Sequence, residues 1–303
     1  MIREQSLRQI EVRRDDFVVD VGGGHRPFWR ADLVIEKFPF DQNLHRDQPM
    51  RFPRVPVIKA DALSMPLQNG GCDLLFASHV IEHLSDPKRF IDEIKRCSRR
   101  VYLEFPSRIR ELMLSWSFHK WLVEAHGSIL KFYLNDLPQL FGPFFHEEHD
   151  AALGAWSDAR HEQLNQSLYC FSDEIECQFP KETATELVLQ DSPRGEFKIN
   201  FAKSINRPKY TLREILAFAA QSMLSPSFYS RLSRLGQQSL PPLPLPDVVL
   251  ARLMCLRCRT GGLRRTGNII TCQCGAQYSE DRGVFDFELE IQCSAASESN
   301  CPN

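Results

Sequence analysis

One stretch near the N-terminus, FVVDVGGG at Phe17–Gly24, constrains the fold of this chain more than any other. Apolar residues surround a single carboxylate, Asp20, and three glycines follow immediately. A short apolar run that ends in glycines predicts a buried strand that breaks into a tight turn. Such a turn lets the backbone approach a ligand closely and exposes its N–H groups. Because glycine-rich turns are common, this stretch alone fits either a cofactor site or an ordinary strand-to-loop turn.

Strand and helix signals alternate in the first third of the chain. Short apolar runs predict further strands at Asp32–Glu36, Val55–Asp61, Asp73–Ser78 and Arg100–Phe105. The spacing of apolar residues predicts a helix over Asp86–Cys97. Only ten residues separate the first two strands, so the helix between them must be short. The alternation predicts an α/β fold with a doubly wound, mostly parallel sheet.

Polar residues stand where these strands end, which is where ligands bind in doubly wound sheets. The strand ends carry Gly22–Gly24, Glu36, Asp61, Ser78–His79 and Glu104. A carboxylate in the position of Glu36 can accept hydrogen bonds from both hydroxyl groups of a ribose. The side chain of Asp61, or the backbone beside it at Ala62, can meet the amino group of an adenine. The strand ends therefore predict a nucleotide-type cofactor.

Two common nucleotide-binding motifs do not fit the glycine turn. The dinucleotide fingerprint G-x-G-x-x-G needs its last glycine for close packing of helix on strand. Counted from Gly22, that position is occupied by Pro27, and no second mononucleotide half is visible. A P-loop is excluded because no Gly-Lys-Ser/Thr sequence follows the turn.

Four segments in order, DVGGG, VIEKF, DALSMPL and CDLLFASHVIEHLSDPKRFIDEIKR, resemble class I S-adenosylmethionine-dependent methyltransferases. A bacterial branch of these enzymes is similar in its Gly-Gly-His-x-Pro turn, here residues 23–27, and in its His-x-x-Glu-His-x-x-Asp-Pro segment, here residues 79–87. That branch also has a Pro-Ser turn and a later His-x-Trp, found here at Pro106-Ser107 and His119-Lys120-Trp121. The resemblance covers roughly residues 15–130 and implies a Rossmann-like fold.

The resemblance also implies a set of cofactor-binding residues. S-adenosylmethionine would be held by Asp20, Gly22, Gly23, Gly24, Glu36, Asp61, Ala62, Ser78 and His79. In this assignment the glycine turn and Asp20 hold the methionine end, Glu36 holds the ribose, and Asp61 and Ala62 lie beside the adenine. The usual third glycine of the turn is replaced by Arg26, which leaves the path of the cofactor's tail open.

Three histidines, His79, His83 and His119, are candidate general bases for the acceptor. Methyl transfer needs in-line approach above all, and positioning can supply most of the acceleration. A general base matters most for a hydroxyl acceptor. Each histidine has a structural alternative, either in ordering a loop or in an aromatic cluster. The sequence FFHEEHD at 144–150 is not His-Glu-x-x-His, and we interpret it as solvated surface rather than a metal site.

A cysteine cluster near the C-terminus predicts a second, smaller module. Cys255-x-x-Cys258 and Cys272-x-Cys274 provide four soft ligands, which suit tetrahedral Zn²⁺. The sequence LMCLRCRTGGL followed by ITCQCGAQYSEDRGVFDF resembles the small zinc-ribbon activators of tRNA and ribosomal-factor methyltransferases. Those activators bind methyltransferase subunits, so the resemblance implies that this ribbon docks within its own chain on the methyltransferase domain.

Length and patterning predict how these modules divide the chain of 303 residues. We expect a methyltransferase domain at 1–210, a helical segment and Pro-rich linker at 211–247, a zinc ribbon at 248–290 and a disordered tail at 291–303, which contains Cys293 and Cys301. Strands at Gln166–Phe171 and Glu174–Phe179 are expected to finish the sheet antiparallel, and Thr211–Met223 is expected to be a helix. Nothing resembles a secretory signal or a membrane span of about 20 apolar residues, which predicts a cytoplasmic protein.

The sequence leaves two classes of methyl acceptor open. A third possibility is that the chain keeps the fold without catalysing a reaction. One class is a small molecule or glycan intermediate. The other is RNA or the translation apparatus, for which six arginines of the ribbon could contact phosphate: Arg252, Arg257, Arg259, Arg264, Arg265 and Arg282. The net charge of −2 argues against a chain-wide basic surface and favours the first class.

Overall fold

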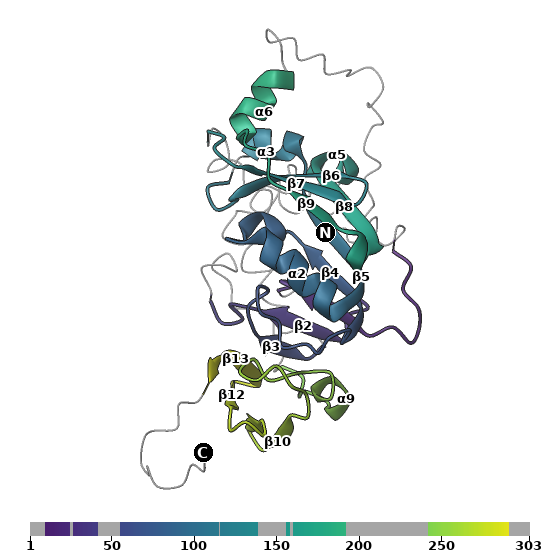
Figure 1. The fold of residues 1–303 in the computed structure, drawn as a ribbon, viewed down its shortest axis with the longest axis vertical. Coiled ribbons are helices and arrows are strands. Elements are labelled where there is room, and N and C mark those ends of the chain that lie inside the picture. The colour runs from purple at the N-terminus through teal and green to yellow at the C-terminus, as the bar shows by residue number, and fades with distance from the viewer. Residues whose placement is uncertain are drawn as a thin grey trace, which may run out of the picture. The chain divides into compact units, whose positions relative to one another are not determined.

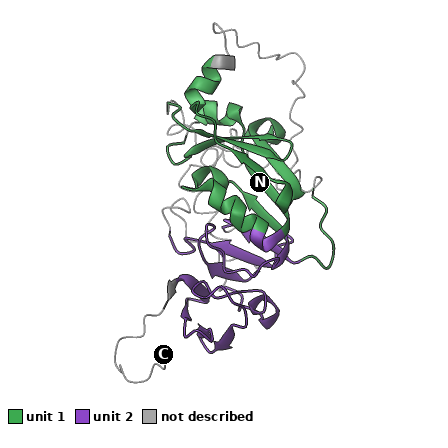
Figure 2. Ribbon diagram, viewed as in Figure 1, with its two compact units in different colours: residues 1–16, 74–95, 99–238 green, residues 17–73, 96–98, 239–303 purple. Residues whose placement is uncertain are grey.

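The computed structural model describes residues 10–24, 27–41, 55–114, 116–138, 156–157, 160–191 and 242–290. The chain forms two compact units that are not contiguous in sequence (Figure 2). Unit 1 comprises residues 1–16, 74–95 and 99–238, and unit 2 comprises residues 17–73, 96–98 and 239–303.

Unit 2 contains the predicted first three strands, β1 (Val18–Val21), β2 (Leu33–Glu36) and β3 (Val57–Lys59). They run parallel, with β2 between its two neighbours. All residues of β1 and β2 are buried, as continuous apolar strands of a parallel sheet should be. The short helix expected between β1 and β2 is not formed by the described residues of that interval, which make turns instead.

The C-terminal part of unit 2 adds four strands to the same sheet (Figure 1). These are β10 (Arg264–Thr266), β11 (Ile269–Thr271), β12 (Gln277–Asp281) and β13 (Val284–Glu290), and successive strands pair antiparallel. Strand β13 also pairs in parallel with β3, and Val284 packs against Val34 and Val57. The strand order within unit 2 is therefore β10-β11-β12-β13-β3-β2-β1, preceded in the C-terminal segment by the short helix α9 (Asp247–Leu250).

Unit 1 is built largely on β4 (Cys72–Ser78), β5 (Ser98–Pro106) and β8 (Asn165–Phe171). Helix α2 (Pro87–Cys97) buries the apolar side chains that its spacing predicted. Strand β8 pairs antiparallel with β5, so the antiparallel strand expected at Gln166–Phe171 is confirmed. Unit 1 also contains α3 (Arg108–Leu114), α5 (His161–Leu164), α6 (Ala184–Asp191) and the short 3-10 helices η2 (Ile81–His83) and η3 (Ser172–Glu174).

A second sheet in unit 1 corrects the interpretation of Glu174–Phe179. Its strands are the hairpin β6 (Trp121–His126) and β7 (Ile129–Leu134), with β9 (Glu176–Gln178) parallel to β7. The expected antiparallel strand that would finish the main sheet is therefore wrong. Phe179, just after β9, stacks on Phe132 with ring centroids 5.2 Å apart, so aromatic packing favours the second sheet.

Several sequence predictions fall on residues outside the described ranges. These are His25 and Arg26 of the glycine turn, the FFHEEHD segment at 144–150, the helix at 211–223, the domain boundary at 210 and the tail at 291–303 with Cys293 and Cys301. Among the helices that the structure describes, none has the length and apolar character needed to cross a membrane.

Candidate functional site

The turn after β1 needs glycine at each of its three positions. Gly22 and Gly24 have φ angles of 69° and 53°, in the left-handed region that favours glycine. A Cβ atom added to Gly23 would lie 2.5 Å from Oδ2 of Asp20. The turn therefore leaves its backbone uncovered by side chains, as close approach of a ligand requires.

Asp20 holds the loop that follows this turn. Its side chain is fully buried in β1, and Oδ2 accepts a hydrogen bond of 2.5 Å from the backbone N–H of Phe28. A buried carboxylate needs such donors because burial without them is costly. The contact ties the residues around Phe28 to the end of β1 and so sets the shape of the loop.

In unit 2, Glu36 ends β2, and Asp61 follows the neighbouring parallel strand β3 by two residues. Glu36 is 8% exposed, and its carboxylate accepts hydrogen bonds from the backbone N–H groups of Gly24 and Phe38, both at 3.2 Å. Asp61 accepts one from Leu63 at 2.8 Å and pairs with Lys37 at 2.5 Å, and Ala62 beside it is buried. Each carboxylate oxygen has two lone pairs, so these contacts leave Glu36 able to accept from a hydroxyl.

The structure thus brings Asp20, the glycine turn and Glu36 into direct contact, and places Asp61 at the start of the connection that follows β3. Their roles in holding S-adenosylmethionine stay predictions. Asp20 also stabilises the loop after the turn, because its carboxylate accepts a hydrogen bond from the backbone N–H of Phe28.

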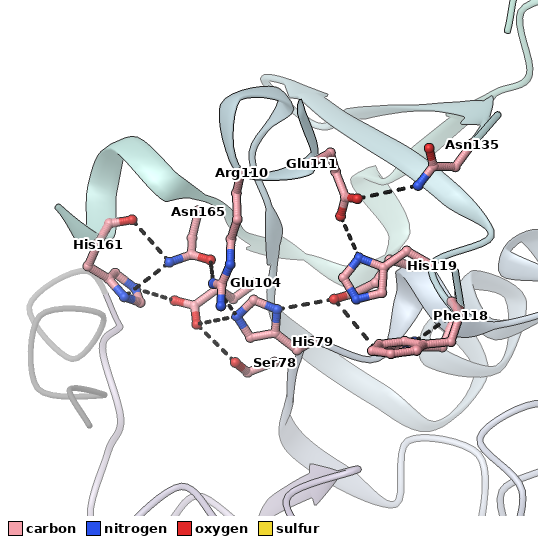
Figure 3. Close-up of polar contacts among 12 residues, drawn as sticks. Ser78, His79, Glu104, Arg110, Glu111, Phe118, His119, Asn135, His161 and Asn165 are labelled. Atoms are coloured by element: carbon pink, nitrogen blue, oxygen red, sulfur yellow. Dashed lines mark hydrogen bonds and ion pairs between the residues drawn. The ribbon is translucent and has the colours of Figure 1, made fainter. Parts of the chain in front are cut away.

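In unit 1, Ser78 and His79 end β4 beside a buried carboxylate, Glu104 of β5 (Figure 3). Ser78 Oγ donates to Glu104 Oε1 at 2.9 Å, and the backbone N–H of His79 donates to the carbonyl of Glu104 at 2.8 Å. His79 has a φ angle of 57°, uncommon for a residue other than glycine. Backbone strain of this kind concentrates at functional sites, where the surrounding contacts hold it in place.

Two further residues that sequence reasoning missed, His161 and Asn165, complete this network (Figure 3). His161 Nε2 donates to Glu104 Oε2 at 2.8 Å, and the Asn165 amide donates to His161 Nδ1 at 3.2 Å. Arg110 of α3 donates to Asn165 Oδ1 at 2.6 Å and lies 3.5 Å from His79 Nε2. The only signal in the sequence was Glu104 itself, because the residues that contact it come from a region without recognisable motifs.

Glu82 in η2 fixes the tautomer of His79. Glu82 is fully buried, and its Oε1 lies 3.1 Å from His79 Nδ1. Burial alone raises the pKa of Glu82, but the hydrogen bond from His79 and the neighbouring His83 lower it to about 2. An ionised carboxylate can only accept, so Nδ1 of His79 carries the proton. Nε2 of His79 then keeps its lone pair and can accept, and Arg110 lies 3.5 Å from it.

His83 and His119 lie next to one another, with ring centroids 4.7 Å apart. His119 Nδ1 is 2.5 Å from Glu111 Oε1, and Glu111 Oε2 accepts from the Asn135 amide at 3.3 Å (Figure 3). His83 Nδ1 lies 3.3 Å from the backbone carbonyl of Phe118. Burial lowers the pKa of His83, although Glu82 acts in the opposite direction. The three histidines predicted as candidate bases therefore share one region of unit 1, joined through Glu82.

The four predicted metal-ligating cysteines come together in unit 2. Their sulfur atoms lie within 4.8 Å of one another, with Cys255–Cys274 at 3.6 Å and Cys258–Cys272 at 3.5 Å. Four sulfurs bound to a tetrahedral Zn²⁺ lie about 3.8 Å apart, so the arrangement fits this ion. Hydrogen bonds from Thr260 lower the pKa of the Cys258 thiol to about 6, which favours the thiolate that binds metal.

Residues 35–100 match a family described as a methyltransferase domain. The matched segment runs from β2 to β5 and contains Glu36, Asp61, Ser78, His79 and Glu82. No curated protein matches the chain.

Several solved structures are similar to parts of the chain. An S-adenosylmethionine-dependent methyltransferase from Thermotoga maritima is 19% identical over 34% of this chain and 50% of its own, with a TM-score of 0.28. Phosphoethanolamine N-methyltransferase 1 of Haemonchus contortus is 16% identical over 35% and 25%, with a TM-score of 0.27. A complex that contains the Haloferax volcanii Trm112 methyltransferase activator gives 16% identity over 47% and 75%, with a TM-score of 0.30.

The chain spans about half the length of the Thermotoga maritima protein. The domain match covers the ends of β2 and β4 but not the glycine turn after β1 or Glu104. The match of residues 35–100 therefore identifies a methyltransferase domain in this part of the chain.

Proposed function

We propose that this chain transfers the methyl group of S-adenosylmethionine to a small molecule or a glycan intermediate. The observation that carries the proposal is the cluster at the strand ends of unit 2. There, Gly23 has no room for a side chain, and Gly22 and Gly24 adopt φ angles that favour glycine. The turn adjoins Glu36, whose carboxylate is fixed by two backbone N–H groups. An exposed backbone suits the methionine end of the cofactor, and a fixed carboxylate suits its ribose.

At the acceptor, His79 is better placed as a general base than His119. Its side chain is 33% exposed, whereas that of His119 is 7% exposed. Glu82 holds the proton on Nδ1, which leaves Nε2 to take a proton from a hydroxyl. Such a base contributes about 10²–10⁴-fold to the rate. Arg110, which lies 3.5 Å from Nε2, would orient an anionic group of the acceptor.

The contacts of the ribbon arginines favour a small acceptor over RNA. Arg252, Arg265 and Arg282 lie over the rings of Phe17, Phe285 and Phe40, at 4.4, 5.0 and 3.5 Å from the ring centroids. Arg259 donates to Ser64 at 3.1 Å. Side chains that pack on their own unit offer less charge to a phosphate backbone than free ones.

For the cysteine cluster we propose one structural Zn²⁺ in a zinc ribbon, held by Cys255, Cys258, Cys272 and Cys274. Four thiolates leave no position open for water, which is typical of structural sites. Docking of this ribbon within the chain is supported by the pairing of β13 with β3. It is also supported by the ion pair of 2.8 Å between Lys59 and Asp286.

The test is release of S-adenosylhomocysteine with panels of hydroxylated small molecules, glycan intermediates and RNA. We expect turnover in one of the first two panels and a loss of about 10²-fold or more in His79→Ala. His126→Ala removes an exposed histidine of β6 and is the matched control, expected to keep full turnover. Turnover with RNA alone, lost as salt is raised, would replace the proposed acceptor class by the second one.

A further inference from the structure

A second group of metal-ligating side chains lies in unit 1, whereas the four cysteines belong to unit 2. Glu82, His83 and His119 each place one ligand atom within 4.8 Å of the others. The group joins η2 to the segment just before β6, and the backbone N–H of Lys120 donates to the carbonyl of Glu82 at 2.8 Å. Two imidazoles and one carboxylate are a common ligand set for transition metals.

The carboxylate of Glu82 carries an independent sign of a missing partner. Its Oε1 is engaged by His79, but Oε2 is buried and has no hydrogen-bond partner among the residues that the structure describes. The Glu82 side chain is 0% exposed. A buried, ionised oxygen without a donor is costly, and a bound cation would remove that cost.

Both histidines hold their rings in the tautomer that a metal requires. A backbone carbonyl can only accept, so His83 Nδ1 carries a proton that it donates to Phe118. His119 Nδ1 faces the carboxylate of Glu111 in the same way, at 2.5 Å. In both rings Nε2 is left with its lone pair. Metal-ligating histidines commonly donate their other nitrogen to a carboxylate or a backbone carbonyl, and the two rings here show one of each.

We propose that Glu82, His83 and His119 bind one divalent transition-metal cation through the Glu82 carboxylate and the two Nε2 atoms. Imidazole nitrogens favour Zn²⁺, Co²⁺ or Fe²⁺ over Mg²⁺ and Ca²⁺, which prefer all-oxygen sites. Ligand atoms around a tetrahedral Zn²⁺ lie about 3.3 Å apart, so the group closes by no more than about 1.5 Å on binding. His83, whose side chain is 36% exposed, provides the path of entry.

Three protein ligands leave at least one coordination position open, where an oxygen of a bound molecule can complete the shell. The cysteine cluster differs because its four thiolates close the shell. The two sites are therefore distinguishable by chemistry as well as by place. The inference concerns metal binding alone and stands whichever acceptor the chain methylates.

The test is the number of Co²⁺ ions bound by the full-length chain, measured by equilibrium dialysis and metal analysis. Thiolate-bound Co²⁺ has intense charge-transfer absorption, and Co²⁺ bound by nitrogen and oxygen lacks it, so the two sites are counted separately. We expect Glu82→Gln and His119→Ala each to lose one equivalent of the second kind and to keep the thiolate signal. His126→Ala is the control and should bind as the wild type does.

Glu111→Gln separates a positioning role from simple structural damage. Glu111 is not a ligand, so this variant should keep the stoichiometry and bind Co²⁺ about 10–100-fold more weakly. Glu82→Gln is close in shape to the wild type, and circular dichroism checks that it folds. If folded Glu82→Gln binds as much Co²⁺ without thiolate absorption as the wild type, the site is not where we place it. The same conclusion follows if the wild type binds Co²⁺ only through thiolates.

Discussion

Replacing Gly23 with alanine tests whether the turn after β1 can accept any side chain. The added Cβ would lie 2.5 Å from Oδ2 and 2.7 Å from Cγ of Asp20, which real structures do not tolerate. The carboxylate is fully buried and cannot swing into solvent, so it must give up its hydrogen bond from Phe28 or the turn must move. A hydrogen bond to a charged group contributes about 1.5–3 kcal/mol, and overpacking costs about 1–3 kcal/mol.

We therefore expect Gly23→Ala to lower the free energy of unfolding by about 1–3 kcal/mol in urea denaturation, whichever of the two occurs. Movement of the turn should also weaken S-adenosylmethionine binding, by about tenfold for each 1.4 kcal/mol lost there. Gly127→Ala is the matched control. Gly127 has a φ angle of 63°, but an added Cβ meets nothing within 4 Å, so only about 1 kcal/mol of backbone strain is expected. Equal stability losses in the two variants, with unchanged cofactor affinity in Gly23→Ala, would refute the reasoning.

Three further predictions concern other parts of the chain. Cys258→Ser should remove the one equivalent of zinc that the four cysteines bind, measured by elemental analysis, and destabilise unit 2 through β13, which pairs with β3. His119→Ala should lower turnover without changing cofactor affinity in calorimetry, and unchanged turnover would exclude any role in the acceptor site. The pKa of Glu82 is lowered to about 2 from an ordinary 4.5, so its contribution to stability is complete above pH 4.5 and is lost as the pH falls toward 2. Glu82→Gln should remove that part of the pH dependence of stability. If the variant loses as much stability as the wild type between pH 4.5 and pH 2, the lowered pKa of Glu82 is contradicted.

The parallel strands were predictable because their residues bury both faces of the sheet. Val18–Val21 and Leu33–Glu36 are continuous apolar runs that end at glycine or a carboxylate, and the structure confirms them as β1 and β2. Helix α2 was predictable for a similar reason, since Phe90, Ile91 and Ile94 repeat at helical spacing and are all buried. These signals are local, so one sequence suffices to read them.

The hairpin β6–β7 and the pairing of β9 could not be predicted from local sequence patterns, because they depend on contacts between residues far apart in the chain. Phe179 stacks on Phe132 from a point more than forty residues further along the chain, and this contact favours the second sheet over an extension of the first. The network around Glu104 has the same character, because His161 and Asn165 meet it only once β8 has paired with β5. The four cysteines were easier, since their spacing alone indicates a common metal.

Binding of S-adenosylmethionine to the purified full-length chain by isothermal titration calorimetry tests the central claim most directly. Glu36→Ala removes the carboxylate that Gly24 and Phe38 hold in place, which is worth about 1.5–3 kcal/mol to a ribose hydroxyl. We predict one site per wild-type chain and binding about 10–100-fold weaker in Glu36→Ala. The control Asp92→Ala, which removes a surface carboxylate paired with Lys88, should bind as the wild type does. No binding to the wild type, or equal affinity in Glu36→Ala and the wild type, would contradict the account.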